Sequence, residues 1–249
     1  MSSAHENIHD EIKEQTKKWK DMTPKQKWGY FWEYYKIPTL VAICIIATVI
    51  VFVKDYIEGQ KETLLYAVFV NSNPMNDYEQ LAAAFASYAD IDLEQNHVTI
   101  DSSVQSGGSN YQMDMASTQK MMAMVSAGTL DVFLGSEAAF CNYTDAGYFA
   151  DLRTILPDDI LKSYADDFYY YTYDPQAAKA EAEEVGVQYE ESDGPYDTLE
   201  PVPIGIKVTA LPNLPENTFQ STDDCIFGIF ANSEHTELAL LFLNYLEGK

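Results

Sequence analysis

An uncharged apolar run, Ile37 to Val53, constrains this chain more than any other feature. At about 1.5 Å per residue, a helix of this length covers roughly 26 Å, close to the ~30 Å hydrocarbon core of a bilayer. The sequence contains no second run of comparable length. We therefore expect one transmembrane helix that divides the chain into a short N-terminal part and a large C-terminal part.

The lysines on either side of this run predict its orientation. Lys54 and Lys61 follow it closely, whereas the lysines that precede it most closely are Lys17, Lys18, Lys20, Lys25, Lys27 and Lys36. Because lysines near a span stay in the cytoplasm, we expect the N-terminus inside and the C-terminal domain outside the plasma membrane. Residues 1–36 hold seven lysines and six acids, which leaves eight basic residues against thirty-three acidic ones outside. Such a charge disfavours nucleic acid and favours cationic partners.

A cleaved signal peptide is the competing interpretation of the apolar run. Signal peptides have a short charged leader and end at a small-residue cleavage site. Here 36 residues precede the run, and Ile50 to Val53 offers no such site. Thr23 and Pro24 form a helix start, with Gln26 three residues after the cap. We therefore favour an uncleaved signal-anchor helix over residues 23–55, with its membrane core at 37–53.

Aromatic residues gather just before the run, where amphipathic rings favour the headgroup region. The anchor residues we expect at this depth are Trp28, Trp32, Tyr34 and Tyr35. Residues 1–22 read as a cytoplasmic juxtamembrane helix that lies on the inner leaflet. His5 and His9 have a spacing that can hold a metal, but no third ligand is specified. A solvated helix face is the favoured interpretation, and we expect no metal site.

The pattern after a polar linker at residues 56–63 predicts an α/β domain over residues 64–249. Apolar or alternating strand patterns alternate with helical ones in the order strand 64–70, helix 78–88, strand 97–104, helix 115–127 and strand 130–134. This order implies parallel strands whose carboxyl ends form a cleft. Further strands are expected at 168–173, 187–190, 202–208 and 225–231, with helices at 176–184 and after a Ser233 cap.

The candidate ligand-binding residues lie in two places. Polar side chains occupy the expected cleft loops: Asn71, Ser72, Asn73, Ser106, Ser109, Ser136 and Glu137. Turn formation alone would also explain the Asn and Ser residues. In the aromatic strand, Tyr169, Tyr171 and Tyr173 can stack on a ligand, although core packing is the commoner role of such rings.

Two cysteines, Cys141 and Cys225, fall in the expected outer domain, where a disulfide is permitted. Their contact cannot be judged from sequence, and two separate buried thiols are favoured over a pair.

Two passages carry a family resemblance. Residues 127–132 and 147–152 resemble the "a-G-x-x-D-V … G-x-x-x-D-L" passage of extracellular solute-binding proteins of ABC importers, and residues 227–246 are similar to the closing strand and helix of that family. The resemblance implies a periplasmic-binding-protein-like fold with two lobes around a hinge. Lobe 1 would cover about residues 64–160 and 222–249, and a reduced lobe 2 about 161–221. Residues 31–36 and 202–206 also resemble membrane-anchored proteins of unassigned function from Gram-positive bacteria.

The functional expectation is a membrane-tethered module that captures a small solute or an envelope partner by cleft closure, in the service of an ABC importer or another membrane protein. The alternative is a cell-envelope scaffold that keeps the fold without a ligand cleft. We expect no enzyme and no cofactor, because the sequence lacks a nucleophile elbow, a zincin motif and a dinucleotide fingerprint.

Overall fold

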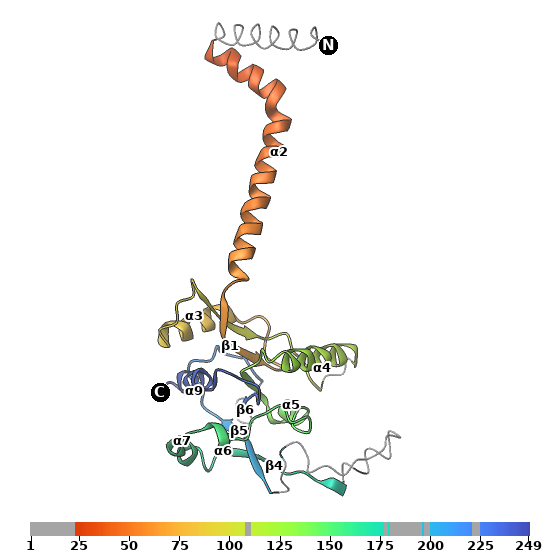
Figure 1. Cartoon of the computed structure of the whole chain (residues 1–249), viewed down its shortest axis with the longest axis vertical. Helices are drawn as coiled ribbons and strands as arrows, with labels where there is room; N and C mark the ends of the chain where they lie inside the picture. Colours follow the sequence, from red (N-terminus) through yellow and green to blue (C-terminus); the bar gives the residue numbers. More distant parts are fainter. Residues whose placement is uncertain (1–22, 108–110, 177–178, 180–195, 197–199, 221–224) are drawn as a thin grey trace, which may run out of the picture. The chain divides into compact units, whose positions relative to one another are not determined.

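The computed structural model describes residues 23–107, 111–176, 179, 196, 200–220 and 225–249 (Figure 1). The chain divides into two compact units, Met1–Gln60 and Lys61–Lys249. The juxtamembrane helix expected over residues 1–22, the strand expected at 187–190, Ser109 and most of the helix expected at 176–184 lie outside the described residues.

The first unit contains the helix α2, Pro24–Glu58. It begins at the proline whose fixed φ suits the first helical position. Its segment Tyr35–Glu58 is long and apolar enough to cross a membrane, a test that membrane anchors and signal sequences both meet. Pro38 lies inside the helix, where proline removes a backbone hydrogen bond, and α2 bends toward its N-terminal end in Figure 1.

The connection after α2 is shorter than the linker expected at residues 56–63. The helix continues to Glu58, and the first strand begins at Glu62, so only residues 59–61 lie between them.

The second unit is built from both helices and strands. The elements are β1 (Glu62–Phe69), α3 (Tyr78–Tyr88), β2 (Asn96–Asp101), α4 (Tyr111–Ser126), β3 (Val132–Ser136), α5 (Glu137–Cys141), α6 (Leu152–Ile155), α7 (Asp158–Ser163), β4 (Phe168–Tyr171), β5 (Val202–Val208), β6 (Cys225–Ile229) and α9 (Thr236–Leu246). The described strands form one six-stranded sheet in the order β2-β1-β3-β6-β5-β4.

The first three strands confirm the parallel arrangement predicted from the sequence. β1 pairs in parallel with both β2 and β3, whereas the later pairs β3–β6, β6–β5 and β5–β4 are antiparallel. The protein is therefore a mixed α/β fold. The strands expected in a second lobe, β4 and β5, continue the same sheet through β6, and residues 61–249 form one compact unit. The two-lobe arrangement is not confirmed.

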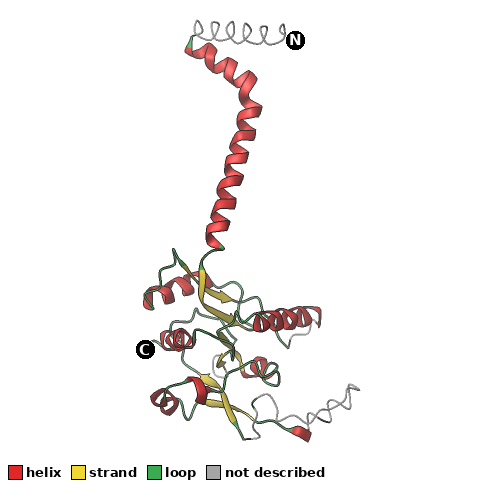
Figure 2. Cartoon of the chain, viewed as in Figure 1, coloured by secondary structure: helices red, strands yellow, loops and turns green. Residues whose placement is uncertain are grey.

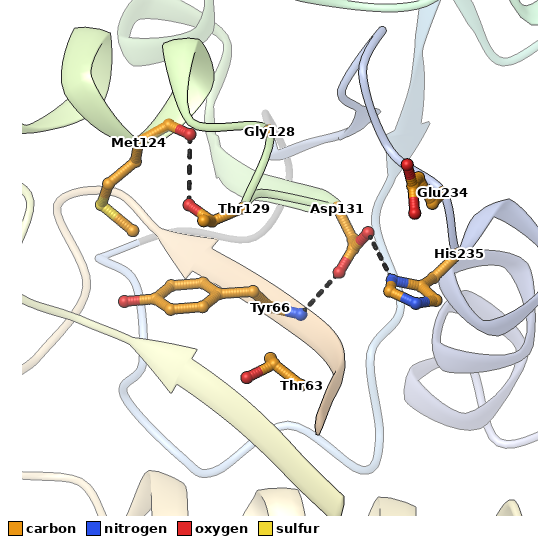
Figure 3. A pocket seen from close by; sticks show the side chains of 8 residues that line it. All are labelled: Thr63, Tyr66, Met124, Gly128, Thr129, Asp131, Glu234 and His235. Carbon is orange, nitrogen blue, oxygen red and sulfur yellow. Dashed lines mark hydrogen bonds and ion pairs between the residues drawn. The ribbon is translucent and has the colours of Figure 1, made fainter. Parts of the chain in front are cut away.

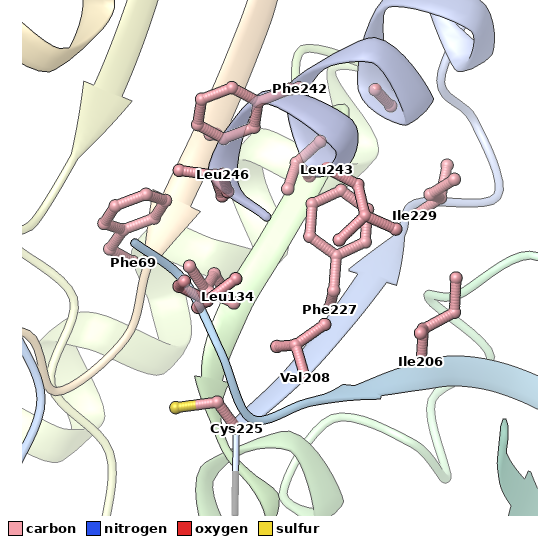
Figure 4. Close-up of a cluster of buried hydrophobic side chains, with 14 of the residues drawn as sticks. Phe69, Leu134, Ile206, Val208, Cys225, Phe227, Ile229, Phe242, Leu243 and Leu246 are labelled. Atoms are coloured by element: carbon pink, nitrogen blue, oxygen red, sulfur yellow. The ribbon is translucent and has the colours of Figure 1, made fainter. Parts of the chain in front are cut away.

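Helices cover both faces of this sheet and give it two cores (Figure 2). On one face α3 and α9 bury apolar side chains against the strands, with Phe85 and Phe242 in edge contact at 4.9 Å between ring centroids (Figure 4 shows Phe242 among its neighbours). On the other face, under α4 and α5, Phe140 stacks on Phe149 at 4.1 Å. Burial of these rings is the main stabilising contribution.

The start of the last helix differs from the sequence prediction. α9 begins at Thr236, and His235 occupies the cap position without a side-chain cap bond. Ser233, the predicted cap, donates its hydroxyl hydrogen to Asp131 Oδ1 at 2.7 Å, and its Oγ accepts from His235 N at 3.2 Å. The hydroxyl thus supplies a donor to a buried carboxylate, for which an unsatisfied charge would be costly.

Candidate functional site

The predicted cleft loops come together at the carboxyl ends of the parallel strands. Asn71 Nδ2 donates to the Ser106 carbonyl at 2.8 Å, and Ser106 N donates to Asn71 Oδ1 at 2.8 Å. Asn142 Nδ2 donates to Ser106 Oγ at 2.8 Å. Asn71 also adopts a φ of 59°, a left-handed conformation that asparagine tolerates. These polar groups hold two loops to each other.

The other predicted polar residues at this edge also serve local structure. Ser72 is buried and donates to the Phe69 carbonyl at 3.0 Å, and Asn73 Oδ1 accepts from Met75 N. Ser136 Oγ accepts from Ala139 N at 3.3 Å and caps α5, and Glu137 follows in the first turn of that helix. The turn-forming and capping roles explain these positions.

The predicted tyrosines lie against the core under α5. Tyr169 packs edge-on against Phe140 at 5.3 Å, and its hydroxyl lies 3.1 Å from Cys141 Sγ. Tyr171 donates to Asp145 Oδ1 at 3.0 Å, and burial, followed by this carboxylate, raises the pKa of Tyr171. Tyr173 is partly buried in the same cluster. A ligand role for the three tyrosines stays a prediction.

A pocket of about 510 Å³ opens at the opposite, amino-terminal edge of the parallel strands (Figure 3). Its size falls within the range of small-molecule sites. The described residues that line it are Thr63, Tyr66, Met124, Gly128, Thr129, Asp131, Glu234 and His235. They come from β1, the end of α4, the residue before β3 and the two residues before α9.

Asp131 organises this pocket. It is 4% exposed, and its Oδ2 accepts from Tyr66 N at 2.8 Å. Its Oδ1 accepts from Ser233 Oγ and lies 3.2 Å from His235 Nδ1. The backbone N–H of Asp131 donates to the Tyr66 carbonyl, and its carbonyl accepts from Phe230 N. One carboxylate thus joins β1, β3 and the connection from β6 to α9.

The contact with Asp131 indicates which ring nitrogen of His235 carries a hydrogen. An ionised carboxylate accepts only, so Nδ1 of His235 is the donor, and in the neutral ring Nε2 is then an acceptor. Figure 3 shows Glu234 beside this ring, and Glu234 is exposed. The described lining contains no lysine or arginine. The pocket therefore presents acceptors and negative charge.

Two local features shape the α4 side of the pocket. Gly128 has a φ of 66°, the left-handed conformation that often ends a helix, and no other residue adopts it so readily. Thr129 Oγ1 donates to the Met124 carbonyl at 3.1 Å, which keeps the Thr129 hydroxyl near the helix end. The side chain of Met124 adds an apolar, adaptable surface.

A hydrogen-bond network holds the Tyr66 ring in the wall of the pocket. The Tyr66 hydroxyl donates to Asp101 Oδ2 at 3.1 Å, and Lys120 Nζ donates to the same oxygen at 2.5 Å. Burial, together with the Asp101 charge, raises the pKa of Tyr66 to about 12. Tyr66 therefore stays neutral and fixed at physiological pH.

The candidate site expected from the sequence lies at the other end of the strands from this pocket, although the sequence held two signals for the pocket. Asp131 is an acid within an otherwise apolar strand pattern, and a buried acid requires a partner. His235 is one of two histidines after the apolar run. Gly128 and Asp131 also belong to the passage that carries the family resemblance.

An aspartate–histidine pair also occurs in catalytic sites, where it activates a nucleophile. Among the described residues, no hydroxyl or thiol is hydrogen-bonded to Nε2 of His235. The contacts of the pair instead join segments of the backbone.

No protein-family model and no curated protein matches this chain. Among solved structures, the ABC substrate-binding protein Lmo0181 from Listeria monocytogenes, in complex with cycloalternan, is similar with a TM-score of 0.25 and 14% sequence identity. The similarity covers 53% of this chain and 36% of that protein, so the chain spans little more than a third of its length. This is a weak structural neighbour.

Proposed function

We propose that residues 61–249 are an extracellular binding module, tethered to the plasma membrane by α2, that captures a small positively charged solute without chemistry. The observation that carries this proposal is the pocket of about 510 Å³, in which polar groups converge around Asp131 and His235. A concave site with a few placed polar groups is typical of small-molecule binding.

The charges of the pocket favour a cation over an anion. Glu234 and Asp131 are carboxylates, and the described lining offers no basic side chain except the imidazole of His235. An ammonium group near Glu234 gains Coulomb energy that grows as water is excluded. The strongly acidic composition after the membrane run also raises the local concentration of cations.

The single sheet supports capture by a preformed pocket rather than by closure of two lobes. The walls of the pocket are strand ends and helix ends that Asp131 joins by hydrogen bonds. A tethered module cannot diffuse away from its membrane, so the recipient of the solute is a protein in the same bilayer, such as an importer.

A thermal-unfolding screen of the full chain in detergent or nanodiscs tests this proposal. The probes are arginine, lysine, choline and spermidine, with acetate, glutamate and neutral sugars as the contrasting set. A ligand that binds the folded state raises the melting temperature with concentration. We expect this shift for cations and its loss in Glu234→Gln and His235→Gln.

Glu237→Gln is the matched control, because Glu237 is an exposed carboxylate in the first turn of α9 that does not line the pocket. Loss of Glu234 should weaken binding by about tenfold, or roughly 1.4 kcal/mol. Equal weakening by both glutamate substitutions would assign the effect to general surface charge and reject the pocket.

A second candidate, a scaffold without a ligand, is favoured by the predicted cleft edge. There Asn71 and Ser106 bond to each other, and Tyr169 packs on Phe140. If no cation, sugar, amino acid or peptide shifts the melting temperature, the scaffold function replaces solute capture.

A further inference from the structure

A second hollow, of about 620 Å³, lies along α2 near the start of the apolar segment. The described residues that line it are Trp28, Gly29, Trp32 and Lys36. Trp28, Trp32 and Lys36 are spaced four residues apart, so they follow one another along one side of a helix. The hollow thus combines two indoles, a notch and a positive charge.

Gly29 forms the notch between the two indoles. Apart from the adjoining residues and the backbone of α2 itself, a Cβ added at this position would meet no atom within 4 Å in the part of the chain that the structure describes. Glycine is a poor helix former, so alanine would suit a helix interior better if the position served only the helix. Gly29 therefore leaves an open face on α2 beside the two indoles, among the described residues.

We infer that this hollow binds an anionic phospholipid of the leaflet at the N-terminal end of the span, with the phosphate at Lys36 and the rest of the headgroup in the notch between Trp28 and Trp32. Lys36 directly precedes Ile37, the first residue of the apolar run. A lysine at this depth extends its ammonium group into the headgroup layer. The indole rings are 67% and 61% exposed and carry N–H donors for phosphate or ester oxygens.

Charge supports a lipid as the occupant. Between Thr23 and Lys36 the sequence has three lysines, Lys25, Lys27 and Lys36, and one acid, Glu33. Basic segments next to a span attract anionic headgroups. An aromatic belt alone would need the rings but no glycine between them.

A second copy of the helix fits the sequence less well. Close helix pairs in membranes place small residues four positions apart. The positions four residues from Gly29 are Lys25 and Glu33, which are long and charged. The hollow therefore suits a flexible lipid better than another helix.

Quenching of tryptophan fluorescence by brominated lipids tests this inference. The full chain carries Trp19→Phe, which leaves Trp28 and Trp32 as the fluorophores. It is placed in phosphatidylcholine nanodiscs that contain a minor fraction of acyl-brominated phosphatidylglycerol, or the same fraction of acyl-brominated phosphatidylcholine. We expect stronger quenching by the anionic lipid, because it is enriched in the hollow.

Two substitutions and two matched controls separate this site from a general attraction. Lys36→Gln should lower the enrichment by about fivefold, and Gly29→Leu should abolish it by filling the notch. Lys54→Gln removes a lysine at the other end of α2, and Ala47→Leu adds one carbon less than Gly29→Leu in mid-helix, so both should leave the enrichment unchanged. Equal quenching by the two lipids in the parent, or equal loss in the control variants, would overturn the inference. A change of oligomeric state in Gly29→Leu with unchanged lipid enrichment would assign the hollow to a second copy instead.

Discussion

Nδ1 of His235 lies 3.2 Å from Oδ1 of Asp131, although 104 positions of sequence separate the two residues. The same oxygen accepts from Ser233, and the other carboxylate oxygen accepts from the backbone of Tyr66. Because this carboxylate connects three segments of chain, it supports both the fold of the domain at residues 61–249 and the shape of the pocket.

Asp131→Asn should destabilise the domain by about 1–3 kcal/mol, since an amide cannot accept every hydrogen bond that the buried carboxylate accepts. In a domain of this size the melting temperature should fall by about 2–4 °C for each kcal/mol. Thermal unfolding followed by circular dichroism measures the shift. Asp159→Asn, on the exposed first turn of α7, is the control and should change stability by less than about 0.5 kcal/mol. Equal effects in the two variants would contradict a special role for Asp131.

Gly228→Ala should destabilise the domain by about 1–3 kcal/mol through overpacking. A Cβ at this position would lie 2.7 Å from Cε2 of Phe140 and 3.0 Å from Cδ1 of Phe149, two rings that stack on each other. Phe140→Leu removes ring atoms from this contact. The free energy of unfolding should therefore fall less in the double variant Gly228→Ala/Phe140→Leu than the sum of its falls in the two single variants. Chemical denaturation of all four proteins measures the coupling, and strictly additive losses would rule out the clash.

The ion pair of Asp101 with Lys120 should make the stability of the domain depend on acid pH. Burial alone would raise the pKa of Asp101, but the hydrogen bonds from Lys120 and Ser103 outweigh it and hold that pKa below its ordinary value of 3.8. A carboxylate with a lowered folded-state pKa contributes stability above its ordinary value, and this contribution is lost as the pH falls through the folded-state pKa.

The stability difference between the wild type and Lys120→Met should therefore be present near neutral pH and should shrink at pH values below 3.8. Urea unfolding at several pH values measures it. Lys162→Met, exposed on α7, serves as the control. A difference that stays constant across the pH range would mean that Lys120 acts through its aliphatic chain and not its charge.

The two cysteines of the α/β domain should react as thiols of unequal accessibility. Cys141 is exposed, Cys225 is 1% exposed, and the structure keeps them as separate thiols, so the expectation that both would be buried is wrong for Cys141. In a Cys44→Ser background, a thiol reagent should label one site in the folded protein and two after denaturation. Mass spectrometry counts the labels, and no labelling without a reductant would instead reveal a disulfide.

The parallel half of the sheet could be predicted from the sequence, because the hydrophobic periodicity of a strand depends only on neighbouring residues. The apolar run that became β1 and the alternation around His97 predicted two of its strands. The end of the third strand shifted: it was predicted at Leu130 to Leu134 and lies at Val132–Ser136. The Asp131 side chain faces the pocket network there, and strand pairing sets the boundary.

The site was less predictable, because hydrogen-bond partners are a tertiary property. Nothing near Asn71 in the sequence shows that both its amide atoms bond to Ser106, which lies 35 positions away. The pairing of Asp131 with His235 also cannot be predicted from the sequence, although an acid in an apolar strand pattern indicates that some partner is required.

The three residues between α2 and β1 have a mechanical consequence. β1 is an interior strand with a parallel neighbour on each side. Tension on the helix therefore enters the sheet through an inner strand, which must slide past β2 and β3 together before it can leave. Because every ladder hydrogen bond of such a strand resists sliding at once, force applied along β1 from its N-terminal end loads the sheet in shear and does not peel its edge.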